Sequence, residues 1–127
     1  MGSEAEWYVL VERNEGSIDM EWTLREKIHA EGGREAASAK AEEIARSYPA
    51  RDYYSQDETG RSVFRISETS WLVEVTRSWW NDEAKKASTA SSHIRVSLAE
   101  LVYFKETPPA EPPPAKGGRL GRMLKRG

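Results

Sequence analysis

A run of prolines near the C-terminus sets the first limit on what this chain can fold into. Residues 108–114 read Pro-Pro-Ala-Glu-Pro-Pro-Pro. Proline has no backbone N–H to donate and its φ angle is fixed, so such a run cannot lie inside a helix or a central strand. We therefore expect a globular domain over residues 1–106, followed over residues 107–127 by a proline-rich linker and a basic docking peptide.

The charges of the chain divide at the same place. Residues 107–127 hold five of the 19 Lys and Arg residues but one of the 21 Asp and Glu residues, which leaves 14 basic and 20 acidic groups in the body. An acidic body argues against a broad phosphate-binding surface, because such a surface needs positive charge to release counterions. The difference in charge marks the tail as a separate functional unit.

Composition narrows the class of protein further. The chain has no cysteine, which excludes disulfides, thiol catalysis and cysteine-built zinc sites. It also has no apolar run of membrane-spanning length, and its N-terminus is polar and acidic rather than that of a signal peptide. We expect a cytoplasmic protein without a transmembrane segment.

Alternating apolar and polar residues predict a mainly antiparallel sheet. Strands are expected over residues 6–13, 18–28, 61–67 and 71–80, and residues 81–92 are expected to form a polar loop. A last element runs over residues 93–104, where Ser97 and Glu100 fit a capping box that would insert a helical turn. In the second strand one face is predicted to carry Met20, Trp22, Leu24 and Ile28.

One helix is predicted over residues 34–48, after Gly32 and Gly33 and before Pro49. Its small-residue stripe at helical spacing comprises Ala37, Ala41, Ile44, Ala45 and Tyr48. The element order indicates an α+β fold, with a mainly antiparallel sheet of about five strands, one helix packed on a face and a disordered C-terminal tail.

No catalytic pattern is found, so we expect no enzyme, cofactor or metal. His29 and His93 stand alone, without the spacing of a metal site. No serine lies in a G-x-S-x-G segment. Gly32-Gly33 lacks the rest of a phosphate loop, so a flexible helix entry is the simpler interpretation.

Five tryptophans are many for so small a body. Trp7, Trp22 and Trp71 fall in phase with apolar neighbours, which favours core packing. Trp79 and Trp80 are adjacent strand residues and therefore point to opposite faces. Trp80 either caps the sheet edge beneath the following loop or is an exposed anchor for a partner.

The tail carries apolar anchors among basic residues. Leu120, Met123 and Leu124 stand at i, i+3 and i+4, with Arg122 and Lys125 beside them. So short a peptide with internal glycines is expected to gain order only on binding. We expect Leu120, Gly121, Met123, Leu124, Arg122, Lys125 and Trp80 to bind a partner.

Residues 118–125, Gly-Arg-Leu-Gly-Arg-Met-Leu-Lys, resemble the C-terminal cargo-loading peptides of encapsulin cargo proteins. Those are G-x-L-G-x-x-L-K/R segments on Pro/Gly/Ala-rich linkers, bound on the inner wall of a protein nanocompartment. The resemblance implies that Leu120 and Leu124 fill pockets and that Gly121 permits a bend. The chain differs from the pattern at Arg122 and Met123, which are bulkier and more charged than the usual pair.

The function predicted from these observations is a non-enzymatic adaptor that docks onto a partner protein through its C-terminal peptide. A second class is a nucleic-acid-binding protein, in which Arg65, Arg77, Arg95 and the tail supply charge and Trp80 stacks on a base. A third is a small inhibitor or immunity-type protein whose acidic body masks a basic enzyme. A tail that merely solubilises the chain is the simplest alternative.

Overall fold

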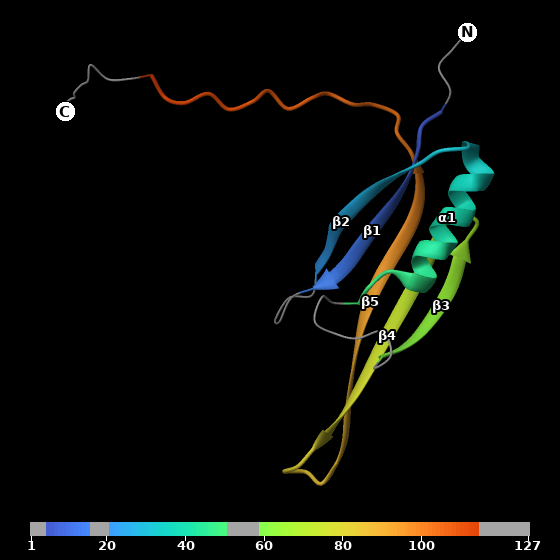
Figure 1. Cartoon of the computed structure of the whole chain (residues 1–127), viewed down its shortest axis with the longest axis vertical. Helices are drawn as coiled ribbons and strands as arrows, with labels where there is room; N and C mark the ends of the chain where they lie inside the picture. The colour runs from blue at the N-terminus through green and yellow to red at the C-terminus, as the bar shows by residue number, and fades with distance from the viewer. Residues whose placement is uncertain (1–4, 16–20, 51–58, 115–127) are drawn as a thin grey trace, which may run out of the picture.

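The alternating segments form one antiparallel sheet with a helix on one face (Figure 1). The computed structural model describes residues 5–15, 21–50 and 59–114. The elements in chain order are β1 (Trp7–Glu15), β2 (Glu21–Ala30), α1 (Gly33–Ser47), β3 (Thr59–Ser67), β4 (Ser70–Asn81) and β5 (Lys86–Glu100). Across the five-stranded sheet the order is β2-β1-β5-β4-β3, so the last strand lies in the middle. The predicted α+β class and element order are confirmed.

The core lies between α1 and the sheet face that α1 covers. Every second residue of β1, β4 and β5 points to the helix, as the pleat requires. These buried residues are Val9, Val11, Trp71, Val73, Val75, Ile94, Val96 and Leu98. The helix contributes Ala37, Ala41 and Ala45, which have no exposed surface and let the helix lie close to the sheet, as predicted. Each large buried side chain contributes roughly 1.5–3 kcal/mol, so this layer is the main hydrophobic term.

The helix begins where two glycines allow a left-handed backbone. Gly32 has φ 98° and Gly33 has φ 90°, values that residues with a Cβ rarely adopt. A Cβ at Gly32 would also lie 2.9 Å from the Cβ of Ala36. The glycine pair is therefore explained by the helix entry, as the sequence analysis favours.

The end of α1 is tied to three strands. From β3, Arg61 donates hydrogen bonds to the carbonyl oxygens of Ala45 (3.0 Å) and Tyr48 (2.5 Å). From β1, Arg13 donates to the carbonyl oxygen of Pro49. The Tyr48 hydroxyl donates to Oε1 of Glu26 in β2 at 2.6 Å. The Arg61 bond to Ala45 satisfies a carbonyl that the last helical turn leaves without an intrahelical donor.

β2 contains a bulge that the sequence analysis misses. Val11 in β1 pairs with Glu26, but the next residue, Glu12, pairs with Leu24. Arg25 is therefore an extra residue on β2. An extra residue shifts every side chain that precedes it to the opposite face of the strand.

The prediction that Trp22, Leu24 and Ile28 share one face is wrong for this reason. Ile28 packs against the core, whereas Trp22 and Leu24 lie on the face that α1 does not cover, which we call the open face. Trp22 is thus not a core residue, and Met20 lies outside the described residues. The other two tryptophans expected in the core do pack there: Trp7 and Trp71.

Two further predictions for the C-terminal half are wrong. The expected loop over residues 81–92 is largely strand, because β4 continues to Asn81, β5 begins at Lys86, and the turn occupies residues 82–85. The capping box at Ser97 and Glu100 forms no helical turn, since both residues lie within β5. β5 pairs with β4 over residues 86–97 and with β1 over residues 94–100. This non-local pairing fixes an extended backbone where local signals favour a turn or a helix.

Candidate partner-binding surfaces

The C-terminal segment leaves the body after the last strand. β5 ends at Glu100, several residues before the expected limit at Glu106, and residues 101–114 form no helix or strand and are exposed. The Leu101 N–H still donates to the carbonyl oxygen of Glu6 at 2.9 Å. Figure 1 shows the segment then running away from the sheet. The predicted anchors lie outside the described residues: Leu120, Gly121, Arg122, Met123, Leu124 and Lys125.

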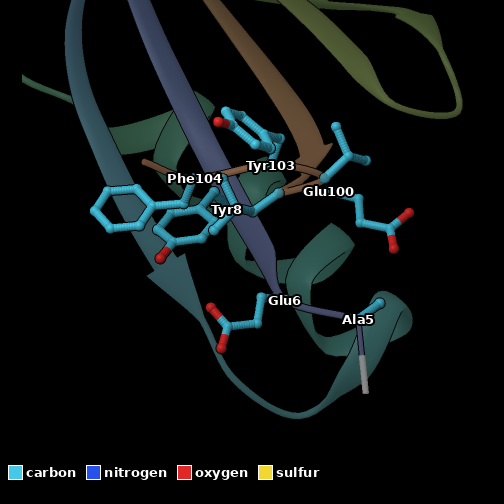
Figure 2. Close-up of a pocket in the computed structure, with 8 residues that line it drawn as sticks. Ala5, Glu6, Tyr8, Glu100, Tyr103 and Phe104 are labelled. Atoms are coloured by element: carbon cyan, nitrogen blue, oxygen red, sulfur yellow. The ribbon is translucent and has the colours of Figure 1, made fainter. Parts of the chain in front are cut away.

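A hollow of about 800 Å³ lies where this segment leaves the sheet. Figure 2 shows the rings of Tyr8 and Phe104 in it, with the carboxylates of Glu6 and Glu100 pointing to opposite sides. Tyr103 and Phe104 are exposed, so the segment presents aromatic surface beside the hollow. The two carboxylates do not face each other, as a general acid–base pair across a substrate would.

A bidentate ion pair lies at the centre of the open face. Arg95 Nε donates to Oε1 of Glu12 at 2.9 Å and its Nη2 donates to Oε2 at 3.2 Å. This hydrogen bond raises the pKa of the Arg95 guanidinium. The ring centroid of Trp22 lies 4.3 Å from the guanidinium carbon. Arg95 is thus fixed between a carboxylate and an indole.

Apolar side chains flank this ion pair on the open face. Leu24 is 50 % exposed and Phe64 is 55 % exposed. They belong to the outer strands β2 and β3, with Glu12, Arg95 and Leu72 between them in the strand register. The face therefore combines a neutralised charge pair with exposed apolar surface, a composition typical of protein contact surfaces.

Both histidines have neighbours on the sheet surface. His29 contacts the Tyr8 ring, with centroids 5.1 Å apart, and His93 Nε2 lies 3.7 Å from Oε2 of Glu74. In the part of the chain that the structure describes, no three or more His, Asp or Glu residues come together as they would around a metal ion. Both histidines are explained as sheet-surface residues.

The tryptophan pair lies at the far end of β4, on the faces that alternation predicts. Trp80 is 62 % exposed and its indole Nε1 donates to Oδ1 of Asp82 at 3.1 Å. Trp79 is 39 % exposed, and the guanidinium carbon of Arg77 lies 4.4 Å from its ring centroid. Of the two alternatives for Trp80, the exposed position is the one observed.

Of the three arginines considered for nucleic-acid contact, two lie on the face opposite to Trp80. Arg77 and Arg65 lie on the α1 side of the sheet, where Arg65 lies 5.6 Å from the Trp71 ring centroid. Arg95 lies on the open side but is paired with Glu12. The body thus presents these charges on two opposite surfaces rather than along one groove.

Comparison with protein-family models, with curated proteins and with solved structures found no match. The helix of the described residues is too short and too polar to cross a membrane.

Sequence reasoning missed the open-face ion pair and the extent of the β4–β5 hairpin. The Glu12–Arg95 contact joins residues far apart in the chain, so no local spacing could reveal it. The hairpin signal was weak because residues 87–92 are alanine, serine and threonine without alternation.

Proposed function

We propose that this protein is a non-enzymatic binding or adaptor protein that docks onto a partner protein through its C-terminal peptide. The supporting observation is that regular structure ends at Glu100 and residues 101–114 leave the body exposed. The prolines in this segment oppose folding back into a helix or sheet. A peptide attached to its outer end is therefore offered at a distance from the body.

The tail has the chemistry of a ligand for an apolar groove with an acidic rim. Leu120, Met123 and Leu124 supply three apolar side chains, and the basic residues between them supply charge. Burial of each apolar side chain contributes roughly 1.5–3 kcal/mol before ordering costs. A single peptide of this kind reaches micromolar affinity at best, since micromolar binding corresponds to roughly 8 kcal/mol, near the top of that sum.

Micromolar affinity is useful when sites are repeated. The resemblance to encapsulin cargo-loading peptides supports a partner of this kind, because a nanocompartment wall presents many identical grooves. Leu120 and Leu124 would fill pockets there, and Gly121 would allow the backbone to approach closely.

The test compares three forms of the full chain by affinity purification from the native host. The first is unchanged, the second carries Leu120→Ala with Leu124→Ala, and the third carries Ala110→Ser with Ala115→Ser as a matched control. We expect one partner to co-purify with the unchanged and control forms and to be lost with the leucine variant. Equal capture by all three forms would refute docking through the tail.

The alternatives are distinguished in the same experiment. Washing with about 0.5 M salt should strip a nucleic acid, because counterion release makes such binding steeply salt-dependent, but should spare an apolar contact. An inhibitor or immunity-type protein would retain its partner when residues 107–127 are deleted, since its acidic body would suffice.

A further inference from the structure

The β4–β5 hairpin extends beyond the rest of the sheet as a two-stranded arm, defined as residues 78–92. β3 pairs with β4 no further than Arg77, and β1 pairs with β5 no further than Ile94. Figure 1 shows the arm projecting past the ends of the other strands. Among the described residues, the β5 side of the arm therefore has a paired edge toward β4 and an unpaired outer edge.

The backbone groups on that outer edge can be assigned. The Leu98 N–H donates toward β4, to Thr69, whereas the Leu101 N–H donates toward β1, to Glu6. Consecutive residues of a strand direct their N–H and C=O groups to opposite edges. The pairing of β5 with β4 has no register shift, so odd-numbered residues on the β5 side of the arm direct these groups outward. The outward residues at the centre of the arm are Ala87, Thr89 and Ser91.

This edge lacks the features that normally protect a strand edge. The two outer strands of the sheet carry charged residues, including Lys27 and Arg25 in β2 and Arg65 in β3. Residues 87–92 carry neither a charge nor a proline, and no bulge interrupts them. An unprotected edge of regular strand is a template for another strand.

We propose that two copies of this chain form a dimer by antiparallel pairing of the outer β5 edges of their arms. A two-fold axis at Thr89 places Thr89 opposite its own copy and Ala87 opposite Ser91. All three direct their backbone groups outward, so the register makes regular hydrogen-bonded pairs. Lys86 then faces Ser92, so no like charges are opposed across the new pair.

The tryptophans favour a second copy over an unrelated strand. Within one arm, Trp79 pairs with Ser88 and Trp80 pairs with Ala87. In the dimer, the row of Trp79 continues through Ser88 to Ala90 of the second copy, and the row of Trp80 continues through Ala87 to Ser91. On both faces an exposed indole thus has two small side chains beside it, which leave space for the ring to lie across the joint. Each copy supplies the same indoles and the same small side chains to the other across the two-fold axis, as an isologous interface requires.

The experiment measures the dimer dissociation constant of the nuclease-treated full chain by sedimentation equilibrium. The matched variants are Thr89→Lys, which opposes two like charges at the axis, and Thr89→Val, which keeps the shape and favours a strand. We expect Thr89→Lys to weaken the dimer at least tenfold and Thr89→Val to leave it as strong as the unchanged chain. A monomer at all concentrations, or a dimer equally insensitive to both substitutions, would overturn the proposal.

A second measurement uses the absence of cysteine. Thr89→Cys introduces a single thiol, and its copy would stand about 5.5 Å away between Cα atoms, within the range of a disulfide. In a glutathione redox buffer we expect a covalent dimer that forms at least tenfold faster than in Ala39→Cys, whose thiol lies on the exposed side of α1. Equal rates would contradict the arm pairing even if Thr89→Lys failed to fold.

Discussion

Arg61 offers the sharpest test of how the helix is fastened to the sheet. Its guanidinium, carried by the outer strand β3, donates to the carbonyl oxygens of Ala45 and Tyr48 at the end of α1. A positive charge at this end also complements the helix dipole. Replacement by methionine keeps an unbranched apolar stem of similar length but removes both donors.

The expected cost follows from these two bonds. A hydrogen bond to a charged group contributes about 1.5–3 kcal/mol, more than a neutral bond. Burial opposes the gain, since it lowers the pKa of the Arg61 guanidinium and thus disfavours the charged form that makes the bonds. We therefore expect Arg61→Met to lose about 2 kcal/mol of unfolding free energy, or about 10 °C in Tm for a domain of this size.

Urea and thermal unfolding of the full chain measure this difference. Arg46→Met is the matched control, because Arg46 also lies near the end of α1 but makes an exposed pair with Glu42 at 3.0 Å. Exposed pairs at this spacing contribute only about 0.3–0.5 kcal/mol. A loss in Arg61→Met no larger than that in Arg46→Met would show that the strand-to-helix bonds do not hold the helix end.

Three further substitutions test other parts of the fold. Gly32→Ala should destabilise the chain by about 1–2 kcal/mol in urea unfolding, since the left-handed backbone and the Ala36 Cβ leave no space; an unchanged midpoint would contradict this. Ala41→Leu should lower the unfolding free energy by about 1–3 kcal/mol through overpacking against the sheet, whereas a rise would reveal an unfilled space. Burial first, and then the hydrogen bond to Glu26, raises the pKa of Tyr48 from 10.0 to about 12. Folding favours the protonated hydroxyl, so this stabilisation is present below pH 10 and is lost as the pH rises toward 12. In Tyr48→Phe the unfolding free energy, measured in urea at each pH, should therefore fall less over this range. An equal fall in both proteins would refute the assignment.

The sequence predicted those parts of the fold in which local pattern and burial agree. In α1 the small residues recur at helical spacing on one side only. That side faces the sheet, and Ala37, Ala41 and Ala45 are buried there. The alternation of β4 likewise places Trp79 and Trp80 on opposite faces. This two-residue alternation of faces is kept wherever the strand has no bulge.

Prediction failed where pairing between distant segments decided the local structure. The extra residue at Arg25 has no local signal, yet it transfers Trp22 and Leu24 to the open face. At the other end, the capping box at Ser97 is a sound local signal that pairing on both sides of β5 overrides. The tail anchors lie outside the described residues, so their assignment from spacing stays a prediction.

The proposed dimer constrains the kind of partner that the tails can serve. Thr89 and Glu100 are eleven residues apart on β5, which is about 36 Å at 3.3 Å per residue. A two-fold at Thr89 directs the two β5 strands oppositely, so the tails would leave about 70 Å apart at opposite ends of the joined sheet. Residues 101–114 add up to about 40 Å of reach at each end.

This separation has a measurable consequence. A partner with one groove would bind the dimer no more tightly than the monomer, whereas an assembly with grooves tens of ångströms apart would gain from both tails at once. Thr89→Lys should therefore weaken binding to a multi-site partner while leaving the affinity for an isolated groove unchanged, as measured on surfaces of high and low partner density. If both affinities stayed the same in a variant shown to be monomeric, the two tails would act independently, and tail docking would stand without any contribution from the arm.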